Sequence, residues 1–178
     1  MEQLFDVIRR VASALARAQI EYRIVGGVAV FLHVQDRDPL AARSTRDVDI
    51  AVDRRDLDRI AEAVREHGFE YRHAAGVDML VDAGQPKARS AVHLIFVGER
   101  VRPEYLEAVP GFSPPVRTDE GGLLAPVTDI VKMKLTSFRL RDRVHLKDLD
   151  AVGLITPEIE ATLSPPLRIR LQAVRLEE

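Results

Sequence analysis

A pair of short segments constrains the fold of this chain more than any other feature of its sequence. In the first, an apolar run passes through Gly26-Gly27 into further apolar residues, which predicts a strand that turns directly into a helix. In the second, Asp47 and Asp49 stand two residues apart in an expected strand, a spacing that puts both side chains on one face. Their Cα atoms would then lie roughly 6.6 Å apart, close enough for two carboxylates to bind one divalent ion or a pair. Because a glycine turn at a helix start can receive phosphate, the two segments together predict metal-assisted chemistry on a nucleotide.

Each segment also has a plainer interpretation. Gly26-Gly27 could be a tight turn without a ligand, and Asp47 and Asp49 could be solvated on a half-exposed strand. Aspartate is a poor strand former, however, so two of them in one strand need a reason. The glycine pair matches neither the dinucleotide-binding pattern Gly-x-Gly-x-x-Gly nor a P-loop, so those two classes are not supported.

Composition excludes several other classes of function. The chain has 178 residues, enough for one domain or for one domain with a helical appendage. Its formal net charge is −2, so contact with RNA or DNA would need a local basic patch. It has no cysteine, which rules out disulfides, zinc–thiolate sites and thiol catalysis. No signal peptide and no apolar run long enough for a bilayer are evident, so we expect a cytoplasmic protein without a membrane partner.

Hydrophobic periodicity predicts alternating helices and strands in the first part of the chain. A helix is expected over residues 2–19 and another over 54–67 with Asp53 as its N-cap. The glycine pair is expected to precede a helix over Val28–His33 and a loop over 35–45. The expected strands are Tyr22–Val25, Val48–Val52, Phe69–His73, Val77–Val81 and Ala91–Val97.

The second part of the chain, from Pro103 onward, is expected to be mostly helical. Residues 110–126 are rich in proline and glycine and predict a connector without an element of its own. A helix capped by Thr128, a helix over about 144–154 and a helical tail should follow. We therefore expect an α/β core over residues 1–102 and a connector with helices over 103–178, packed on that core.

The motifs quoted so far resemble those of the nucleotidyltransferase superfamily, which has the DNA polymerase β-like fold. The chain is most similar to the AbiEii-type branch, toxins of type IV toxin–antitoxin systems, and to small antibiotic-type nucleotidyltransferases. The resemblance spans roughly residues 20–155. The residues that carry it are Val25-Gly26-Gly27, Arg43-Ser44-Thr45-Arg46-Asp47-Val48-Asp49, Lys134-Leu135, Arg141 or Arg143, and Lys147-Asp148-Leu149-Asp150.

This resemblance implies a fold and an activity. The fold would be a mixed β-sheet with flanking helices, followed by a mostly helical C-terminal part. The activity would be transfer of a nucleoside monophosphate (NMP) from a nucleoside triphosphate (NTP) to a hydroxyl group on RNA, protein or a small molecule. Toxin activity, with an antitoxin protein as partner, is a narrower form of the same expectation.

The resemblance also implies roles for individual residues. Gly26 and Gly27 would hold the triphosphate, while Asp47 and Asp49 would bind Mg²⁺ or Mn²⁺. A hydrogen bond from Thr45 could reach one phosphate, and Arg43 would neutralise another.

Two further cations in the second part are candidates for phosphate contacts. Lys134 and Arg141 fall with Ile130 and Phe138 on one expected helical stripe, so both border an apolar face. The plainer interpretation is that their stems cover the core edge while their charged ends form salt bridges.

One position departs from the family pattern. Active members supply a third carboxylate from a later strand, and here the polar residue at the middle of that strand is His93. A neutral imidazole can accept a proton but brings no negative charge and is a poor magnesium ligand. His93 could also be an ordinary buried histidine, and Asp78 with Asp82 could supply the missing carboxylate. The sequence therefore leaves two hypotheses open: an active nucleotidyltransferase, or an impaired one that acts as a nucleotide-binding or interaction module.

Overall fold

The computed structural model describes residues 2–45, 47–84, 91–119 and 121–177. Over these residues the strands form one mixed sheet of seven, in the order β3-β4-β5-β2-β1-β7-β6. Strands β1 and β2 are antiparallel, whereas β2 and β5 run parallel to each other. The strands are β1 (Tyr22–Val25), β2 (Val48–Val52), β3 (Phe69–Ala74), β4 (Val77–Asp82), β5 (Val92–Phe96), β6 (Val116–Arg117) and β7 (Leu123–Leu124).

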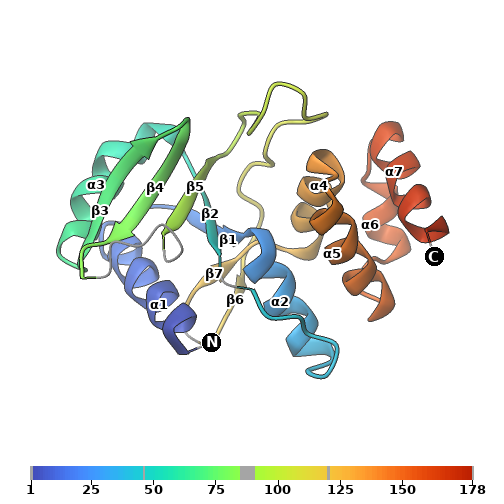
Figure 1. The fold of residues 1–178 in the computed structure, drawn as a ribbon, viewed down its shortest axis with the longest axis horizontal. Helices are drawn as coiled ribbons and strands as arrows, with labels where there is room; N and C mark the ends of the chain where they lie inside the picture. The colour runs from blue at the N-terminus through green and yellow to red at the C-terminus, as the bar shows by residue number, and fades with distance from the viewer. Residues whose placement is uncertain (1, 46, 85–90, 120, 178) are drawn as a thin grey trace.

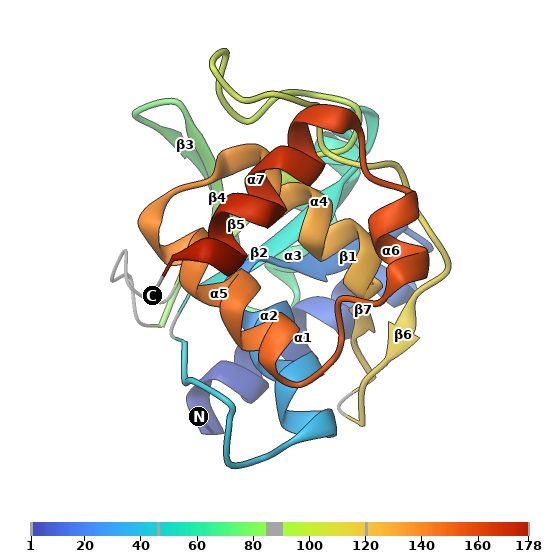
Figure 2. The ribbon, with the colours of Figure 1, turned by 90° about the vertical axis from the view of Figure 1, so that its right-hand side faces the viewer.

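Helices flank this sheet and form the C-terminal part (Figure 1). Helices α1 and α3 pack against each other on one side of the sheet, and α2 contacts β1, β2, α4 and α5. Figure 2 shows the C-terminal helices α4 to α7 gathered on the side that faces the viewer, in front of the sheet. The helices are α1 (Glu2–Arg17), α2 (Gly26–Arg37), the 3₁₀ turn η1 (Arg54–Asp56), α3 (Leu57–Arg65), α4 (Val127–Ser137), α5 (Leu140–Ala151), α6 (Pro157–Ala161) and α7 (Pro165–Leu176). The architecture is therefore the expected one, a mixed sheet with flanking helices followed by a helical part.

The core forms where the predicted apolar stripes meet the sheet. The stripe of α1 is buried throughout, and its residues pack in the same cluster as the sheet residues Ile24, Ile50 and Leu94. At the start of η1, the Asp53 side chain accepts a hydrogen bond from the Arg55 amide, which confirms it as a cap. None of the helices described is both long and apolar enough to span a lipid bilayer.

Helix α2 is longer than the sequence predicts. It begins at Gly26 itself and runs to Arg37, whereas the expected helix covered only Val28–His33. The glycines therefore form the first turn of the helix instead of a break before it. Val25 is the N-cap, and its apolar side chain makes no capping hydrogen bond. The N-cap side chain therefore leaves the first backbone amides of the helix without a partner.

The connector expected over residues 110–126 contains two strands, and that prediction was wrong. Strand β7 pairs in parallel with β1 through Ile24 and Leu124, and β6 pairs with β7. Strands of two residues show no alternation that a sequence pattern could reveal. Both strands come after residue 102 yet belong to the sheet. The domain boundary that we expected at residue 102 remains a prediction.

The junction between α4 and α5 also differs from the prediction. Helix α4 has Pro126, not Thr128, as its N-cap, and it ends at Ser137. Phe138 adopts a left-handed conformation with φ 51° and ends the helix. Helix α5 starts at Leu140, earlier than expected, so Arg141 lies on a different helix from Lys134 and the predicted single stripe is interrupted.

Candidate active site

The predicted motifs meet where three neighbouring strands lie side by side. Strand register places Val25 of β1 beside Asp49 of β2, and Asp49 beside His93 of β5. Gly26 follows Val25 directly, so the glycine turn, the second aspartate and the histidine occupy adjacent positions. The predicted strand of His93 is confirmed as β5, and the structure places it beside the acidic strand.

The glycine turn fits closely against the acidic strand. Gly26 has φ +72°, and a Cβ atom at this position would overlap Oδ2 of Asp49. At Gly27 a Cβ would lie 3.0 Å from Oγ1 of Thr45 and 3.4 Å from Cε1 of His145. Any larger residue would therefore strain the backbone at the first position and crowd the hydroxyl and imidazole at the second. The turn leaves an uncovered helix start next to a carboxylate, which is a place where a phosphate can approach backbone amides.

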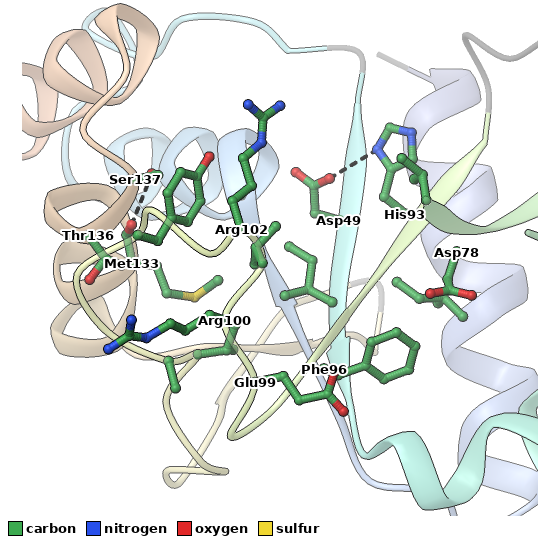
Figure 3. A pocket seen from close by; sticks show the side chains of 18 of the residues that line it. Asp49, Asp78, His93, Phe96, Glu99, Arg100, Arg102, Met133, Thr136 and Ser137 are labelled. Atoms are coloured by element: carbon green, nitrogen blue, oxygen red, sulfur yellow. Dashed lines mark hydrogen bonds and ion pairs between the residues drawn. The ribbon is translucent and has the colours of Figure 1, made fainter. Parts of the chain in front are cut away.

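Asp49 is hydrogen-bonded to His93 within this junction. The two side chains are joined through Oδ1 and Nδ1 at 3.1 Å and are 22% and 35% exposed (Figure 3). This hydrogen bond raises the pKa of His93 above its ordinary value; burial opposes the effect, while the charges of Asp49 and Asp47 add to it. Because a carboxylate only accepts, Nδ1 is the donor, and in the neutral ring Nε2 is left as the proton acceptor.

Asp47 lies directly before β2, which has the predicted bounds Val48–Val52, so Asp49 alone of the two carboxylates belongs to the strand. Its Oδ2 accepts a hydrogen bond of 3.2 Å from Nη1 of Arg141, with both side chains well exposed. Each carboxylate of the predicted metal pair thus has a nitrogen partner. Arg46, the other cation of this motif, lies outside the described residues.

The remaining predicted phosphate cations are also paired within the protein. Arg43 Nε donates to Oδ1 of Asp148 at 2.9 Å, and Nζ of Lys134 donates to Oδ1 of Asp142 at 3.0 Å. The first pair is largely exposed on the arginine side, whereas Lys134 and Asp142 are both buried. A phosphate contact by Arg43, Lys134 or Arg141 stays a prediction.

The buried carboxylate of Asp142 joins α4 to α5. It accepts hydrogen bonds from Lys134, Ser137 and Arg139. Burial raises the pKa of Asp142, but the bonds and charges of Arg139 and Lys134 outweigh this and hold the pKa well below its usual range. The cluster fixes the geometry of the two helices that face the glycine turn.

A cavity of about 630 Å³ opens beside the junction. Gly26, Asp49 and His93 lie on one of its walls, and α4 with the loop after β5 supplies others. Figure 3 shows Asp49 between His93 and Arg102 in this view, with Met133, Thr136 and Ser137 of α4 beyond. The volume falls within the range of small-molecule and cofactor pockets.

Asp78 does not take the place of the third carboxylate. It lies opposite Leu94 in the β4–β5 register, and therefore on the other face of the sheet from His93. Its carboxylate accepts hydrogen bonds from Tyr71 and His73. Asp82 binds Nη1 of Arg10 at 2.6 Å, so both alternatives to His93 belong to other clusters.

His145 of α5 is a site residue that the sequence pattern did not reveal. Its ring borders Gly27, and its Nδ1 is buried without a hydrogen-bond partner among the described residues. Burial, helped by the charge of Lys134, lowers the pKa of His145 to about 4, so the ring is neutral at pH 7. The signal that could have identified it is its position four residues after Arg141, on the same helix face.

The donor set at the junction matches magnesium in part. Magnesium is bound through one or two carboxylates completed by substrate phosphates, and Asp47 with Asp49 supplies that number. No group of three or more His, Cys, Asp or Glu side chains that could hold a metal exists among the described residues. A metal at this junction would therefore depend on phosphate oxygens for its remaining ligands.

Comparison with solved structures shows where this architecture recurs. An antigenic nucleotidyltransferase-like protein from Paracoccidioides brasiliensis is similar with a TM-score of 0.61 and 21% identity, over 98% of this chain and 88% of that chain. ANT(2")-Ia, solved in complex with adenylyl-2"-tobramycin, is similar with a TM-score of 0.53 and 12% identity, over 96% of each chain. At these identities the likeness shows the fold alone. No protein-family model matches the chain, and no curated protein matches it either.

Proposed function

We propose that this protein transfers a nucleoside monophosphate from an NTP to a hydroxyl acceptor and releases pyrophosphate. The observation that carries the proposal is the close fit of Gly26 against Asp49, which joins an uncovered helix start to a carboxylate. The fold that the chain shares with nucleotidyltransferases supports it. Asp49 lies beside His93, so the residues that we propose for binding phosphate, binding metal and accepting a proton are neighbours.

The triphosphate would bind at the start of α2. The amides of Gly26 and Gly27 and the positive end of the helix dipole favour anionic oxygens there. Thr45, whose Oγ1 borders Gly27, is placed to donate a hydrogen bond to the same phosphates. Arg141, which donates a hydrogen bond to Asp47, would add positive charge to the same site.

Asp47 and Asp49 are the residues that would hold Mg²⁺ or Mn²⁺. When bound, the ion neutralises phosphate charge and orients the attacking oxygen. His93 lines the cavity and is held by Asp49 through Nδ1; in its neutral form Nε2 would accept the acceptor proton. The carboxylate of Asp49 therefore fixes the orientation of the imidazole as well as offering oxygen ligands.

The sequence leaves three classes of acceptor open: RNA, protein and a small molecule. The neighbour ANT(2")-Ia was solved with adenylyl-2"-tobramycin bound, which supports a small molecule as one possibility. A narrower hypothesis, from the AbiEii-type resemblance, is a toxin that modifies tRNA and is countered by an antitoxin. We expect a toxin to arrest growth on expression and the Asp49→Asn variant to be harmless; equal arrest by both proteins would contradict this hypothesis.

A second candidate function is a nucleotide-binding or interaction module without turnover. It is favoured by His93 standing beside Asp49, where the resemblance to nucleotidyltransferases would lead one to expect a third carboxylate. Thermal shift with ATP and MgCl₂, read beside turnover, separates the two candidates in wild type, His93→Asp and Asp49→Asn. Stabilisation with transfer in wild type supports the enzyme. Stabilisation without transfer, followed by a gain of transfer in His93→Asp, would instead establish an impaired site.

The direct test of the enzyme is incubation with α-³²P-labelled NTPs, Mg²⁺ or Mn²⁺, and acceptors that include tRNA, the protein itself and aminoglycosides. Label should move to one acceptor class in wild type. Transfer that persists unchanged in both Asp47→Asn and Asp49→Asn would refute the mechanism.

A further inference from the structure

The ring of His145 on α5 borders the glycine turn. Helix α5 packs against α2, and Figure 2 shows the two helices side by side. In this packing, Cε1 of His145 lies 3.4 Å from the position that a Cβ of Gly27 would take, and Oγ1 of Thr45 lies 3.0 Å from the same position. Three parts of the chain therefore meet at Gly27: the start of α2, the segment before β2, and α5.

One nitrogen of this ring lacks a partner within the protein. Nδ1 of His145 is buried and makes no hydrogen bond to any part of the chain that the structure describes. His33, another histidine of the interior, shows the usual arrangement, with Nε2 2.8 Å from the carbonyl oxygen of Ala125. Buried polar groups in proteins are nearly always hydrogen-bonded, and an exception is commonly explained by a bound molecule or a catalytic role. The ring of His145 is therefore a candidate for contact with a ligand.

The chemistry of the ring suits a phosphate oxygen. Cε1, the atom of His145 nearest to Gly27, is bonded to both nitrogens, so the ring faces the glycine turn with its nitrogen-bearing end. Burial, helped by the charge of Lys134, lowers the pKa of His145 to about 4, and the ring is neutral at pH 7. A neutral imidazole carries one N–H donor, and phosphate oxygens are strong acceptors. A phosphate at Gly27 would therefore give the ring a hydrogen bond that the protein alone does not supply.

Strand order places Asp49 between the glycine turn and His93. Strand β2 carries Asp49 and is flanked by β1, which ends at the turn, and by β5, which carries His93. In the proposed reaction His93 takes the proton of the attacking hydroxyl, so the attack comes from the β5 side. Because the attacking and leaving oxygens lie roughly in line on opposite sides of the phosphorus, pyrophosphate leaves on the side of the turn. Gly27 and the ring of His145 lie on that side.

We propose that His145 binds the leaving pyrophosphate, by donating a hydrogen bond from its neutral imidazole to a β- or γ-phosphate oxygen held at Gly27. The acceptor oxygen bonds to the α-phosphorus and its proton goes to His93, while the bond from the α-phosphorus to the bridging oxygen breaks and its electron pair stays on pyrophosphate. The hydrogen bond from His145 stabilises this added negative charge, and the ring keeps its proton. The inference rests on the proposed function, because it assigns a further residue to that reaction.

Calorimetric titration with two probes, α,β-methylene-ATP and inorganic pyrophosphate, each with Mg²⁺, tests the assignment on the full-length protein. His145→Leu, which removes the donor, should weaken binding of both probes at least tenfold. His145→Gln and His145→Asn place an amide N–H near the positions of Nε2 and Nδ1, and we expect one of them to bind within threefold of wild type. His67→Leu, a histidine change outside the site, is the matched control and should bind as wild type does.

Nitrogen-15 spectra of the histidine side chains give a direct readout of the same contact. The chain has five histidines, and the signals that disappear in His145→Gln are those of His145. Addition of Mg²⁺ and pyrophosphate should shift the protonated nitrogen of His145, as expected for a new hydrogen bond. An unchanged signal in a protein saturated with pyrophosphate would contradict the proposed contact.

Three titration results would also overturn the assignment: His145→Leu binds both probes as wild type does, only the ATP analogue is weakened, or wild type binds the analogue but not pyrophosphate. Equal loss in His145→Leu and both amide variants would overturn it as well, because it would show that the ring acts through packing. If wild type fails to bind the ATP analogue, the proposed function itself fails. The wild-type titration thus separates the two failures.

Discussion

Gly26 combines two requirements that no other residue type meets. Its φ of +72° is costly for residues with a Cβ, and a Cβ there would overlap the carboxylate of Asp49. Gly153, at the end of α5, has nearly the same φ of +71°, but a Cβ at that position would meet no atom within 4 Å. Substituting Gly153 would therefore cause backbone strain alone, whereas substituting Gly26 would cause the same strain and also displace Asp49.

We expect Gly26→Ala to weaken binding of Mg²⁺–ATP at least tenfold, because the new methyl group must push Asp49 away from the helix start. Gly153→Ala should bind the nucleotide as wild type does. Both variants should lose ~1 kcal/mol of unfolding free energy from the left-handed conformation, and Gly26→Ala should lose more. Isothermal titration and urea unfolding measure the two effects; equal nucleotide affinity in Gly26→Ala and wild type would contradict the role of this turn.

At the scale of elements, the positions of α4 and α5 depend on a buried ion pair. The carboxylate of Asp142 is fully buried and accepts hydrogen bonds from Lys134, Ser137 and Arg139. Asp150 on the same helix forms an ion pair with Arg175 at the surface instead. Removing one partner of a buried pair leaves an uncompensated charge and costs about 3–5 kcal/mol, while a surface pair contributes about 0–1 kcal/mol.

We therefore expect Asp142→Ala to lower the unfolding free energy by about 3 kcal/mol and Asp150→Ala by at most about 1 kcal/mol. Urea denaturation of both variants, monitored by circular dichroism, compares them directly. If the two losses are equal, the buried cluster does not determine how α4 and α5 pack.

The sequence predicted these elements well where hydrophobic periodicity extended over several residues. It predicted them poorly where local backbone geometry set the ends of an element. The stripe of α1 and the strand β5 were found because burial on one face imposes a repeat, whereas β1 and β2 were found as short runs of mostly buried residues. The two-residue strands β6 and β7 have no repeat to detect, and the left-handed Phe138 ends α4 with no glycine or proline to signal it. The site followed the same division: Gly26, Asp49 and His93 were brought together by strand register, whereas His145 needed the packing of α5 to reach Gly27.

At the scale of the whole molecule, burial of His145 makes stability depend on pH. Its pKa is about 4 in the folded protein against an ordinary 6.5, because burial and the facing charges of Lys134, Arg141 and Arg139 outweigh the attraction of Asp142. Between these values the unfolded chain binds more protons than the folded one, so the unfolding free energy falls as pH is lowered from 6.5 towards 4. Above pH 6.5 this contribution is fully present.

His145→Gln should remove this part of the pH dependence, roughly 2 kcal/mol across the interval after allowance for partial solvent contact. His67→Gln, which replaces a histidine outside the site, should leave the dependence as in wild type. Urea unfolding at a series of pH values between 4 and 7 measures the slopes. Identical slopes in His145→Gln and wild type would contradict the neutral, buried state of this ring.

The measurement that tests the central claim most directly is transfer of label from α-³²P-ATP in the presence of Mg²⁺ or Mn²⁺. Wild type, Asp47→Asn, Asp49→Asn and the surface control Glu62→Gln are compared with the same set of acceptors. The account predicts a labelled acceptor with wild type and Glu62→Gln, and at least a hundredfold loss, about 2.7 kcal/mol of barrier, in each aspartate variant. Equal labelling by wild type and both aspartate variants, or labelled nucleotide that binds without transfer to any acceptor, would contradict it.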